Sequence, residues 1–258
     1  MNDFKLGVAY NVFDGEELIE ESISRIRNTA SYICVVYQEV SNFGQSNDPS
    51  VLNIYKNLLR SKLINDVFIY TPNIGNGHSN ELTKRNIGLD ACRKNGCNVY
   101  SSMDSDEYYI PEEYKNAFDL FVKSSNDSSV CKMLTYYKTK EFILQPPEEY
   151  YVSLFYKHIP NRGYEFCCPF PFLVDPTRRM RTEKCLEFSR DQIQMHHLSY
   201  VRNDIRKKFE NSSARINFGQ KNIDFMVDYY NNWDSTKPAK MMGMTISDYQ
   251  TKKVNYLT

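Results

Sequence analysis

The stretch ELTKRNIGLDACRKNGCNVYSSMDSDEYY, residues 81–109, contains the signals that decide the fold of this chain. Its first half has apolar side chains at helical spacing and ends at an Asn-Gly pair, which predicts a helix over 79–94. The apolar run that follows predicts a buried strand over 99–103. Three carboxylates then follow, Asp104, Asp106 and Glu107. Acidic residues at the carboxyl end of such a strand are typical of an open α/β sheet, where ligands bind outside the strand ends.

The residues that precede this stretch alternate in the same way between strand and helix. Apolar, β-branched runs predict strands, and a period near 3.6 residues predicts helices, the first of them with Asp14 as its N-cap. These expected elements are strands over 6–13, 31–37 and 66–70 and helices over 14–28 and 50–64. The alternation predicts an α/β domain with a mixed, mostly parallel central sheet flanked by helices.

The second half of the chain is less regular. Strand character returns over 130–142 and at 173–174, and a helix is expected over 199–211. Beyond about residue 220 the pattern predicts a helix and a polar tail. The chain of 258 residues is long enough for one large hydrophobic core, and no repeat or low-complexity linker divides it. We therefore expect one continuous domain.

Composition and charge exclude some classes of protein. Lys plus Arg and Asp plus Glu both number 32, and this balance argues against a surface selected for polyanions such as nucleic acid. No run of about 18 apolar residues is present, and acidic residues interrupt the segment where a secretory signal needs an apolar core. The seven cysteines form no CxxC pair, which favours free thiols in a reducing compartment. We expect a soluble, cytoplasmic protein.

The acidic cluster has the chemistry of a metal site. Two aspartates one residue apart, on a turn after a strand, can direct their oxygens to one divalent cation that a phosphate-bearing ligand completes. A solvated acidic turn is the alternative interpretation. An EF-hand calcium loop is excluded because Tyr109 and Lys115 stand where Gly and Glu are required. A phosphatase with an aspartyl nucleophile is disfavoured by Tyr108, and YNVFDGEE lacks the Gly-rich, Arg-containing loop of nucleotidyltransferases.

The order LGVAYNVFDGEELIEESI, SYICVVYQE and ELTKRNIGLDACRKNGCNVYSSMDSDEYY resembles glycosyltransferases of the A-type (GT-A) fold, over residues 4 to about 115. The resemblance implies a nucleotide-sugar donor, with a UDP-sugar as the first expectation, and an Mn²⁺ or Mg²⁺ ion. It implies that residues 1–115 form the nucleotide-sugar-binding half. Residues 116–258 then form the acceptor-binding half and the C-terminal helices of the same domain.

The resemblance also assigns roles to the acidic cluster and to the ends of the first strands. Asp104 and Asp106 match the DxD motif, so Asp106 would ligate the metal and Asp104 would reach the ribose or a metal-bound water. Glu107 is expected to be a local structural carboxylate. The expected contacts to the nucleobase, the ribose, the sugar or the phosphates are Tyr10, Asn11, Gln38, Glu39 and Arg85.

A second constellation is QMHHLSYVRNDIRKKFEN, residues 194–211. Glycosyltransferases of this fold commonly add a histidine ligand to the metal from their C-terminal half. Neighbours in an extended segment point to opposite faces, so one of His196 and His197 is expected to reach the metal, and we favour His197. One or two of the basic residues that follow are expected to face the diphosphate, and the candidates are Arg202, Arg206, Lys207 and Lys208. We expect Lys84 on a solvated helix face.

The resemblance therefore predicts a metal-dependent, hexosyltransferase-like enzyme that moves a sugar from a nucleotide-diphosphate sugar to an acceptor hydroxyl, with a glycan as the first expected acceptor. An inverting enzyme needs a general base, and the candidates in the second half are Glu141, Glu165, Asp175 and Glu183. Aromatic residues over 146–172 are expected to face the acceptor. The alternatives are a non-catalytic binding module for nucleotide sugars or carbohydrates and an enzyme acting on a nucleic-acid base hydroxyl.

Overall fold

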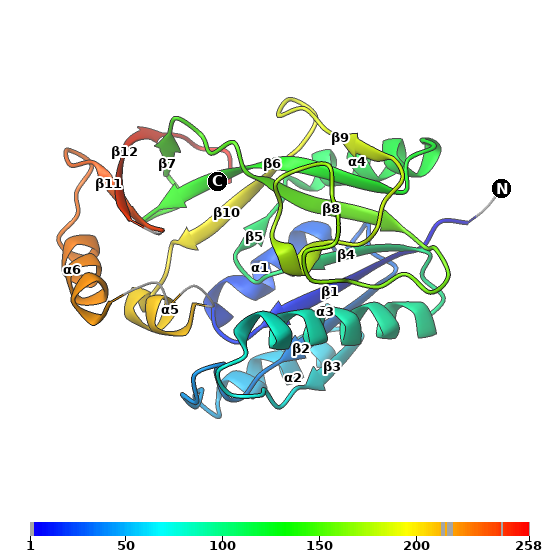
Figure 1. Ribbon diagram of the computed structural model, residues 1–258, viewed down its shortest axis with the longest axis horizontal. Coiled ribbons are helices and arrows are strands. Elements are labelled where there is room, and N and C mark those ends of the chain that lie inside the picture. Colours follow the sequence, from blue (N-terminus) through cyan, green and yellow to red (C-terminus); the bar gives the residue numbers. More distant parts are fainter. Residues whose placement is uncertain (1–2, 213–214, 216–218, 244, 258) are drawn as a thin grey trace.

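Parallel strands form the core of the sheet. The computed structural model describes residues 3–212, 215, 219–243 and 245–257. Within this part of the chain, β1 (Leu6–Val12) lies between β2 (Tyr32–Tyr37) and β4 (Val99–Met103), and β3 (Asp66–Ile69) pairs with β2. All these pairings are parallel, so the carboxyl ends of the strands meet at one edge of the sheet (Figure 1). The predicted α/β class and parallel core are confirmed.

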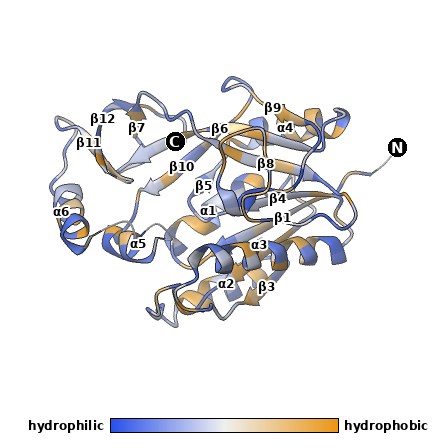
Figure 2. Ribbon diagram, viewed as in Figure 1, coloured by the Kyte–Doolittle hydropathy of each residue, from blue (hydrophilic) through white to orange (hydrophobic). Residues whose placement is uncertain are grey.

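Helices cover both faces of this core. α1 (Glu16–Ile26), α2 (Val51–Arg60) and α4 (Pro111–Lys123) pack on the face to which the even-numbered residues of β1 point. α3 (Gly77–Lys94) packs on the opposite face, against Ala9. Hydrophobic and hydrophilic residues both occur along α2 and α3, as expected for helices with one face on a sheet (Figure 2).

α3 approaches β1 closely at Gly88. A Cβ atom at this position would lie 2.4 Å from the Cβ atom of Ala9, far inside contact distance. Glycine is therefore required for the helix to lie so near the strand. Lys84 and Arg85 stand one turn earlier on α3, and this packing brings both side chains to the carboxyl end of β1, beside Asn11.

The second half extends the sheet with further pairings. The strands involved are β5 (Glu107–Tyr108), β6 (Ser128–Tyr137), β8 (Tyr151–Lys157), β9 (Cys185–Glu187) and β10 (Gln194–Tyr200). β8 is antiparallel to β4 and to β6, whereas β9 and β10 are parallel to β6. β10 is also antiparallel to β5, with His197 opposite Glu107. This pairing brings the histidine pair beside the acidic cluster.

The C-terminal elements pack around a separate hydrophobic cluster that includes Tyr137 and Trp233. These elements are α5 (Ile205–Asn211), α6 (Gln220–Asn231), β7 (Phe142–Gln145), β11 (Ala239–Met242) and β12 (Ile246–Lys253). β12 is antiparallel to both β7 and β11. A short 3₁₀ helix, η1 (Pro176–Arg178), lies beside α3. None of the helices in the described residues is long and apolar enough to cross a membrane.

The structure corrects several predicted elements. The single strand expected over 130–142 is divided into β6 and β7, and 173–174 is not part of a strand. The helix expected from residue 199 begins at Ile205, because Ser199 and Tyr200 belong to β10, which pairs with β6, and Asp204 caps the helix. Gly15, with φ 78°, takes the N-cap position of α1 instead of Asp14. β11 and β12 replace the expected polar tail, and α4 and β8 were not predicted.

Candidate active site

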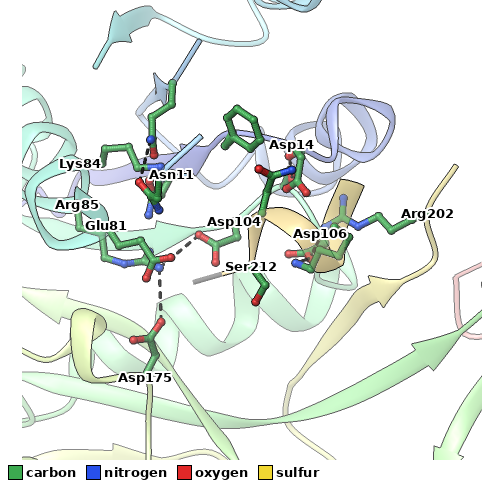
Figure 3. Close-up of a pocket in the computed structure, with 16 residues that line it drawn as sticks. Asn11, Asp14, Glu81, Lys84, Arg85, Asp104, Asp106, Asp175, Arg202 and Ser212 are labelled. Carbon is green, nitrogen blue, oxygen red and sulfur yellow. Dashed lines mark hydrogen bonds and ion pairs between the residues drawn. The ribbon is translucent and has the colours of Figure 1, made fainter. Parts of the chain in front are cut away.

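A polar cavity of about 180 Å³ lies at the carboxyl ends of β1, β2 and β4 (Figure 3). We call it the first cavity. The strand ends supply Asn11, Gln38 and the acidic pair, and α3 supplies Lys84 and Arg85. The segment after β10 and the helix α5 complete the wall on the other side with further basic residues. The cavity therefore lies at the sheet edge where the sequence predicted ligand binding.

Two amide oxygens of the first cavity have no hydrogen-bond partner among the described residues. They are Oδ1 of Asn11 and Oε1 of Gln38, and both side chains are at least nine-tenths buried. The Gln38 amide nitrogen donates to Asn42 Oδ1 at 3.1 Å and to the Val40 carbonyl at 3.2 Å, which leaves the oxygen directed elsewhere. A buried acceptor without a donor is costly. A ligand that presents N–H or O–H groups would satisfy both oxygens.

Lys84 is buried in the wall of the first cavity and does not lie on a solvated helix face as the sequence suggested. Only 4% of the residue is exposed, and no described residue forms an ion pair or hydrogen bond with its ammonium group. Burial lowers the pKa of this group from 10.5 to about 8, although the carboxylate of Glu81 opposes the shift. An anionic ligand would compensate this charge.

Arg85 organises the acidic wall of the cavity. Its guanidinium is buried, and it donates to Ser102 Oγ at 2.7 Å and to Thr177 Oγ1 at 3.2 Å. It also lies 3.4 Å from Asp104 Oδ1 and 3.7 Å from Asp175 Oδ2 (Figure 3). Arg85 therefore joins the carboxyl end of β4 to η1 on the opposite wall.

Arg178 pairs with two carboxylates of the acidic cluster. The sequence did not indicate this residue. Its Nη2 atom donates to Asp104 Oδ2 at 2.6 Å and forms a second short contact with Glu107 Oε1. Burial favours protonation of Asp104, but Arg178 and Arg85 outweigh it and hold its pKa below the ordinary value. Burial raises the pKa of Glu107 to about 7, against the opposing effect of Arg178. Glu107 lies in this buried network, as a structural carboxylate would.

Asp106 is paired with two basic residues from the second half. Its Oδ2 atom accepts from Arg202 Nη2 in a short ion pair and from Lys208 Nζ at 3.3 Å. Burial favours protonation of Asp106, but Lys208 and Arg202 lower its pKa far below the ordinary value. The two other basic candidates point elsewhere: Arg206 pairs with an acidic residue of α6, and Lys207 pairs with one of α1.

The predicted metal ligands lie at one edge of the sheet but do not fit a divalent cation in this arrangement. His197 Nε2 lies 3.9 Å from Asp106 Oδ2, and burial lowers the pKa of the imidazole. Both oxygens of Asp104 and one of Asp106 already accept from basic groups. Among residues 3–212, 215, 219–243 and 245–257, no three His, Cys, Asp or Glu side chains are grouped as a metal site. His196 points to the other face, where its Nδ1 lies 2.8 Å from the Tyr136 hydroxyl.

A second cavity of about 320 Å³ adjoins the first. The two cavities share Glu81, Asp104 and Asp175 in their walls, and these side chains face one another in Figure 3. Asp175 Oδ1 accepts from Thr177 N at 2.7 Å and from its hydroxyl at 2.8 Å. Glu81 has no such partner among the described residues, and burial raises its pKa. These carboxylates lie where a ligand of one cavity would meet a ligand of the other.

A third cavity of about 420 Å³ lies next to the second, since His78 lines both. The rings of His78 and Phe166 are 5.3 Å apart, and 48% of Phe166 is exposed. Tyr150 and Tyr151 stand in the wall of the second cavity. Aromatic residues from 146–172 therefore line these two cavities.

Several residues predicted to form the site lie elsewhere. Tyr10 is fully buried in the core, with its hydroxyl 3.0 Å from Ser22 Oγ, because it points to the face covered by α1. Glu39 is exposed at the end of β2, one residue beyond the cavity wall. Glu183 is exposed and pairs with Arg162. The two remaining candidate bases pair away from the cavities, Glu141 with Lys253 and Glu165 with Arg181.

Glu81 and Arg178 belong to the site but were not singled out. Glu81 could have been found from its position, since it lies one helical turn before Arg85 on the same face of α3. Arg178 stands in an irregular segment, and no spacing in the sequence connects it to the acidic cluster 74 positions earlier.

Comparisons with known proteins add only weak structural similarities. No family model matches the chain, and no curated protein matches it. The chain is similar to a structure of S. aureus TarS 1-349, with 15% identity and a TM-score of 0.48, over 89% of this chain and 71% of that one. A complex of TarS 1-349 with UDP-GlcNAc matches at 19% identity and a TM-score of 0.37, over 51% and 35%.

CMP:2-keto-3-deoxy-manno-octonic acid synthetase complexed with CTP is similar at 10% identity and a TM-score of 0.33, over 59% of this chain and 74% of that one. The similarity to a further TarS structure covers 51% of this chain and 22% of that one. The chain thus spans about a fifth of that protein.

Proposed function

We propose that this chain is a glycosyltransferase that moves a sugar from a nucleotide-diphosphate sugar to a hydroxyl group of an acceptor. The observation that carries the proposal is the pair of adjoining cavities at the carboxyl ends of the parallel strands. The first is polar and contains the buried cations Lys84, Arg85 and Arg202, whereas tyrosine side chains stand in the wall of the second, and the two cavities share three carboxylates. Such a division suits an anionic donor and a neutral, hydroxyl-bearing acceptor.

The donor would bind in the first cavity. The free oxygens of Asn11 and Gln38 suit the N–H groups of a nucleobase or the hydroxyl groups of a ribose. Lys84 and Lys208 suit the diphosphate, since charge-assisted hydrogen bonds to phosphate are among the strongest polar contacts in proteins. The transferred sugar would then lie between the cavities, beside Glu81 and Asp104.

The reaction breaks the bond between the anomeric carbon and the phosphate oxygen, and the electron pair leaves with the nucleoside diphosphate. The acceptor oxygen forms the new bond to the anomeric carbon and loses its proton. The principal electrostatic requirement is therefore stabilisation of the departing diphosphate, which fixed positive charges in a buried site supply. We infer that Asp175 or Glu81 accepts the proton of the hydroxyl, because both line the two cavities and, unlike Asp104, neither accepts a hydrogen bond from Arg85 or Arg178.

The test is a panel of nucleotide sugars, beginning with UDP-sugars, incubated with glycan acceptors. Acceptor-dependent release of nucleoside diphosphate together with a glycosylated product supports the proposal. Asn11→Ala should raise the KM for the donor about fivefold, because one hydrogen bond of about 1 kcal/mol is lost. Glu183→Gln is the matched control outside the cavities and should leave both constants unchanged.

The same experiment separates an enzyme from a binding module. Binding of a nucleotide sugar without release of diphosphate would identify a non-catalytic module, and absence of binding across the panel would refute both functions. A nucleic-acid acceptor would require product formation on DNA or RNA with a steep salt dependence.

A further inference from the structure

The basic residues on Asp106 suggest how the leaving group is neutralised. Arg202 and Lys208 both line the first cavity, and both donate to the same oxygen of Asp106. Asp106 therefore already has two positive partners on one carboxylate oxygen. A carboxylate in this state holds basic groups in place and is poorly available as a metal ligand.

The fold holds Arg202 in a buried position beside Gly15. The residue is 9% exposed, and its Nε and Nη1 atoms have no partner among the described residues. A Cβ atom at Gly15 would lie 2.0 Å from Arg202 Nη1, so a side chain there would push the guanidinium aside, and its φ of +78° also favours glycine. The positive charge of Arg202 stands in the wall of the polar cavity, where it would attract an anionic ligand.

A divalent cation would have to displace this arrangement. The Asp106 oxygen that lies 3.9 Å from His197 Nε2 is the one that accepts from Arg202 and Lys208, so a cation bound there would lie next to both charges. Repulsion between a divalent cation and two neighbouring basic groups opposes such binding. The basic pair already supplies positive charge at that position.

We propose that Arg202 and Lys208 take the place of the divalent cation and neutralise the departing diphosphate, with Asp106 as the positioning residue that holds them. This inference rests on the proposed glycosyltransferase function. The bonds broken and formed are those of the transfer reaction, and no redox step or additional reactant is required.

The first experiment removes metal from the protein with a chelator. Affinity for a nucleoside diphosphate is measured by calorimetry, and transfer is measured with the best donor of the panel. Both should change less than about twofold on chelation, because fixed basic groups carry the charge. Loss of transfer on chelation with recovery on adding Mn²⁺ would overturn the inference and leave the proposed function intact. Absence of nucleoside diphosphate binding with or without Mn²⁺ would overturn both.

The second experiment tests the basic pair directly. Lys208→Met should weaken nucleoside diphosphate binding at least about tenfold and lower kcat about a hundredfold, as expected for a lost charge-assisted contact to the leaving group. Arg206→Met, on the same helix but paired with Asp224, is the matched control and should change neither value. Arg202→Lys keeps the charge in case Arg202→Met does not fold. Wild-type affinity and turnover in Lys208→Met would refute the proposal.

A third measurement does not depend on activity. The double variant Arg202→Met with Lys208→Met leaves Asp106 and His197 without the competing charges, so it should bind Mn²⁺ more tightly than the wild type by at least about tenfold in a paramagnetic resonance titration. Lys208→Met alone should show part of this gain if the double variant does not fold. Equal or tighter Mn²⁺ binding by the wild type, lost in Asp106→Asn, would overturn the inference.

Discussion

Replacing Lys84 by Met should stabilise the ligand-free protein while weakening donor binding. Only 4% of the residue is exposed and its ammonium lacks an ion-pair partner among the described residues, so the folded state carries a buried charge that Glu81 compensates only in part. A fall in pKa from 10.5 to about 8 corresponds to about 3 kcal/mol of lost stability at pH 7. Methionine has nearly the same shape without the charge, so Lys84→Met should recover most of this energy.

The sign of the pH dependence follows from the same shift. Between about pH 8 and 10.5 the unfolded chain still binds the Lys84 proton and the folded chain has released it, so the stability of the wild type rises with pH in this window. The advantage of Lys84→Met should therefore fall from about 3 kcal/mol at pH 7 to about 1 kcal/mol near pH 9.5. The other titratable groups are the same in both proteins, so their contributions to the pH dependence of stability cancel in the comparison.

Urea unfolding of the wild type and Lys84→Met at both pH values measures this difference, with exposed Lys56→Met as the control for removing a lysine. The reasoning is refuted if the variant is less stable than the wild type at pH 7, or if the difference does not change with pH. A nucleoside diphosphate should then raise the Tm of the wild type more than that of the variant, since the ligand compensates a charge that the variant lacks.

Three further changes test other parts of the site. Arg178→Met should cost about 3 kcal/mol in urea unfolding because it leaves the buried carboxylate of Glu107 without a partner. Adding Glu107→Gln should recover part of the loss, and additive effects of the two changes would contradict the contact. Phe166→Ala should raise the KM for the acceptor severalfold. Phe225 is equally exposed, at 48%, and serves as the control, so Phe225→Ala should leave this KM unchanged. Equal effects of the two changes would show that Phe166 does not contact the acceptor. Gly15→Ala should destabilise the protein by at least about 1 kcal/mol and lower kcat, since the added Cβ atom would contact Arg202. An active, equally stable variant would show that Gly15 does not fix the position of Arg202.

The sequence alone determined the architecture of the first half. Apolar period and turn residues act over a few positions, so they located β1 to β4, the helices between them and the acidic pair at the end of β4. The alternation of side chains along a strand also predicted that neighbouring histidines face apart, which they do. The same rule puts Asn11 and Tyr10 on opposite faces of β1. Which of them lies in the cavity wall and which in the core depends on the face that α1 covers, and the sequence alone did not indicate that face.

Only the tertiary structure decided which charges meet. Arg202 contacts Asp106 across 96 positions and Arg178 contacts Asp104 across 74, through the pairing of β10 with β5 and the placement of η1 beside α3. Local periodicity indicates the face of a helix or strand on which a residue lies, but long-range strand pairing decides which other residues contact that face. Lys84 illustrates the difference, since a polar residue in a helical pattern suggests solvent, and the close approach of α3 to β1 buries it at the cavity instead.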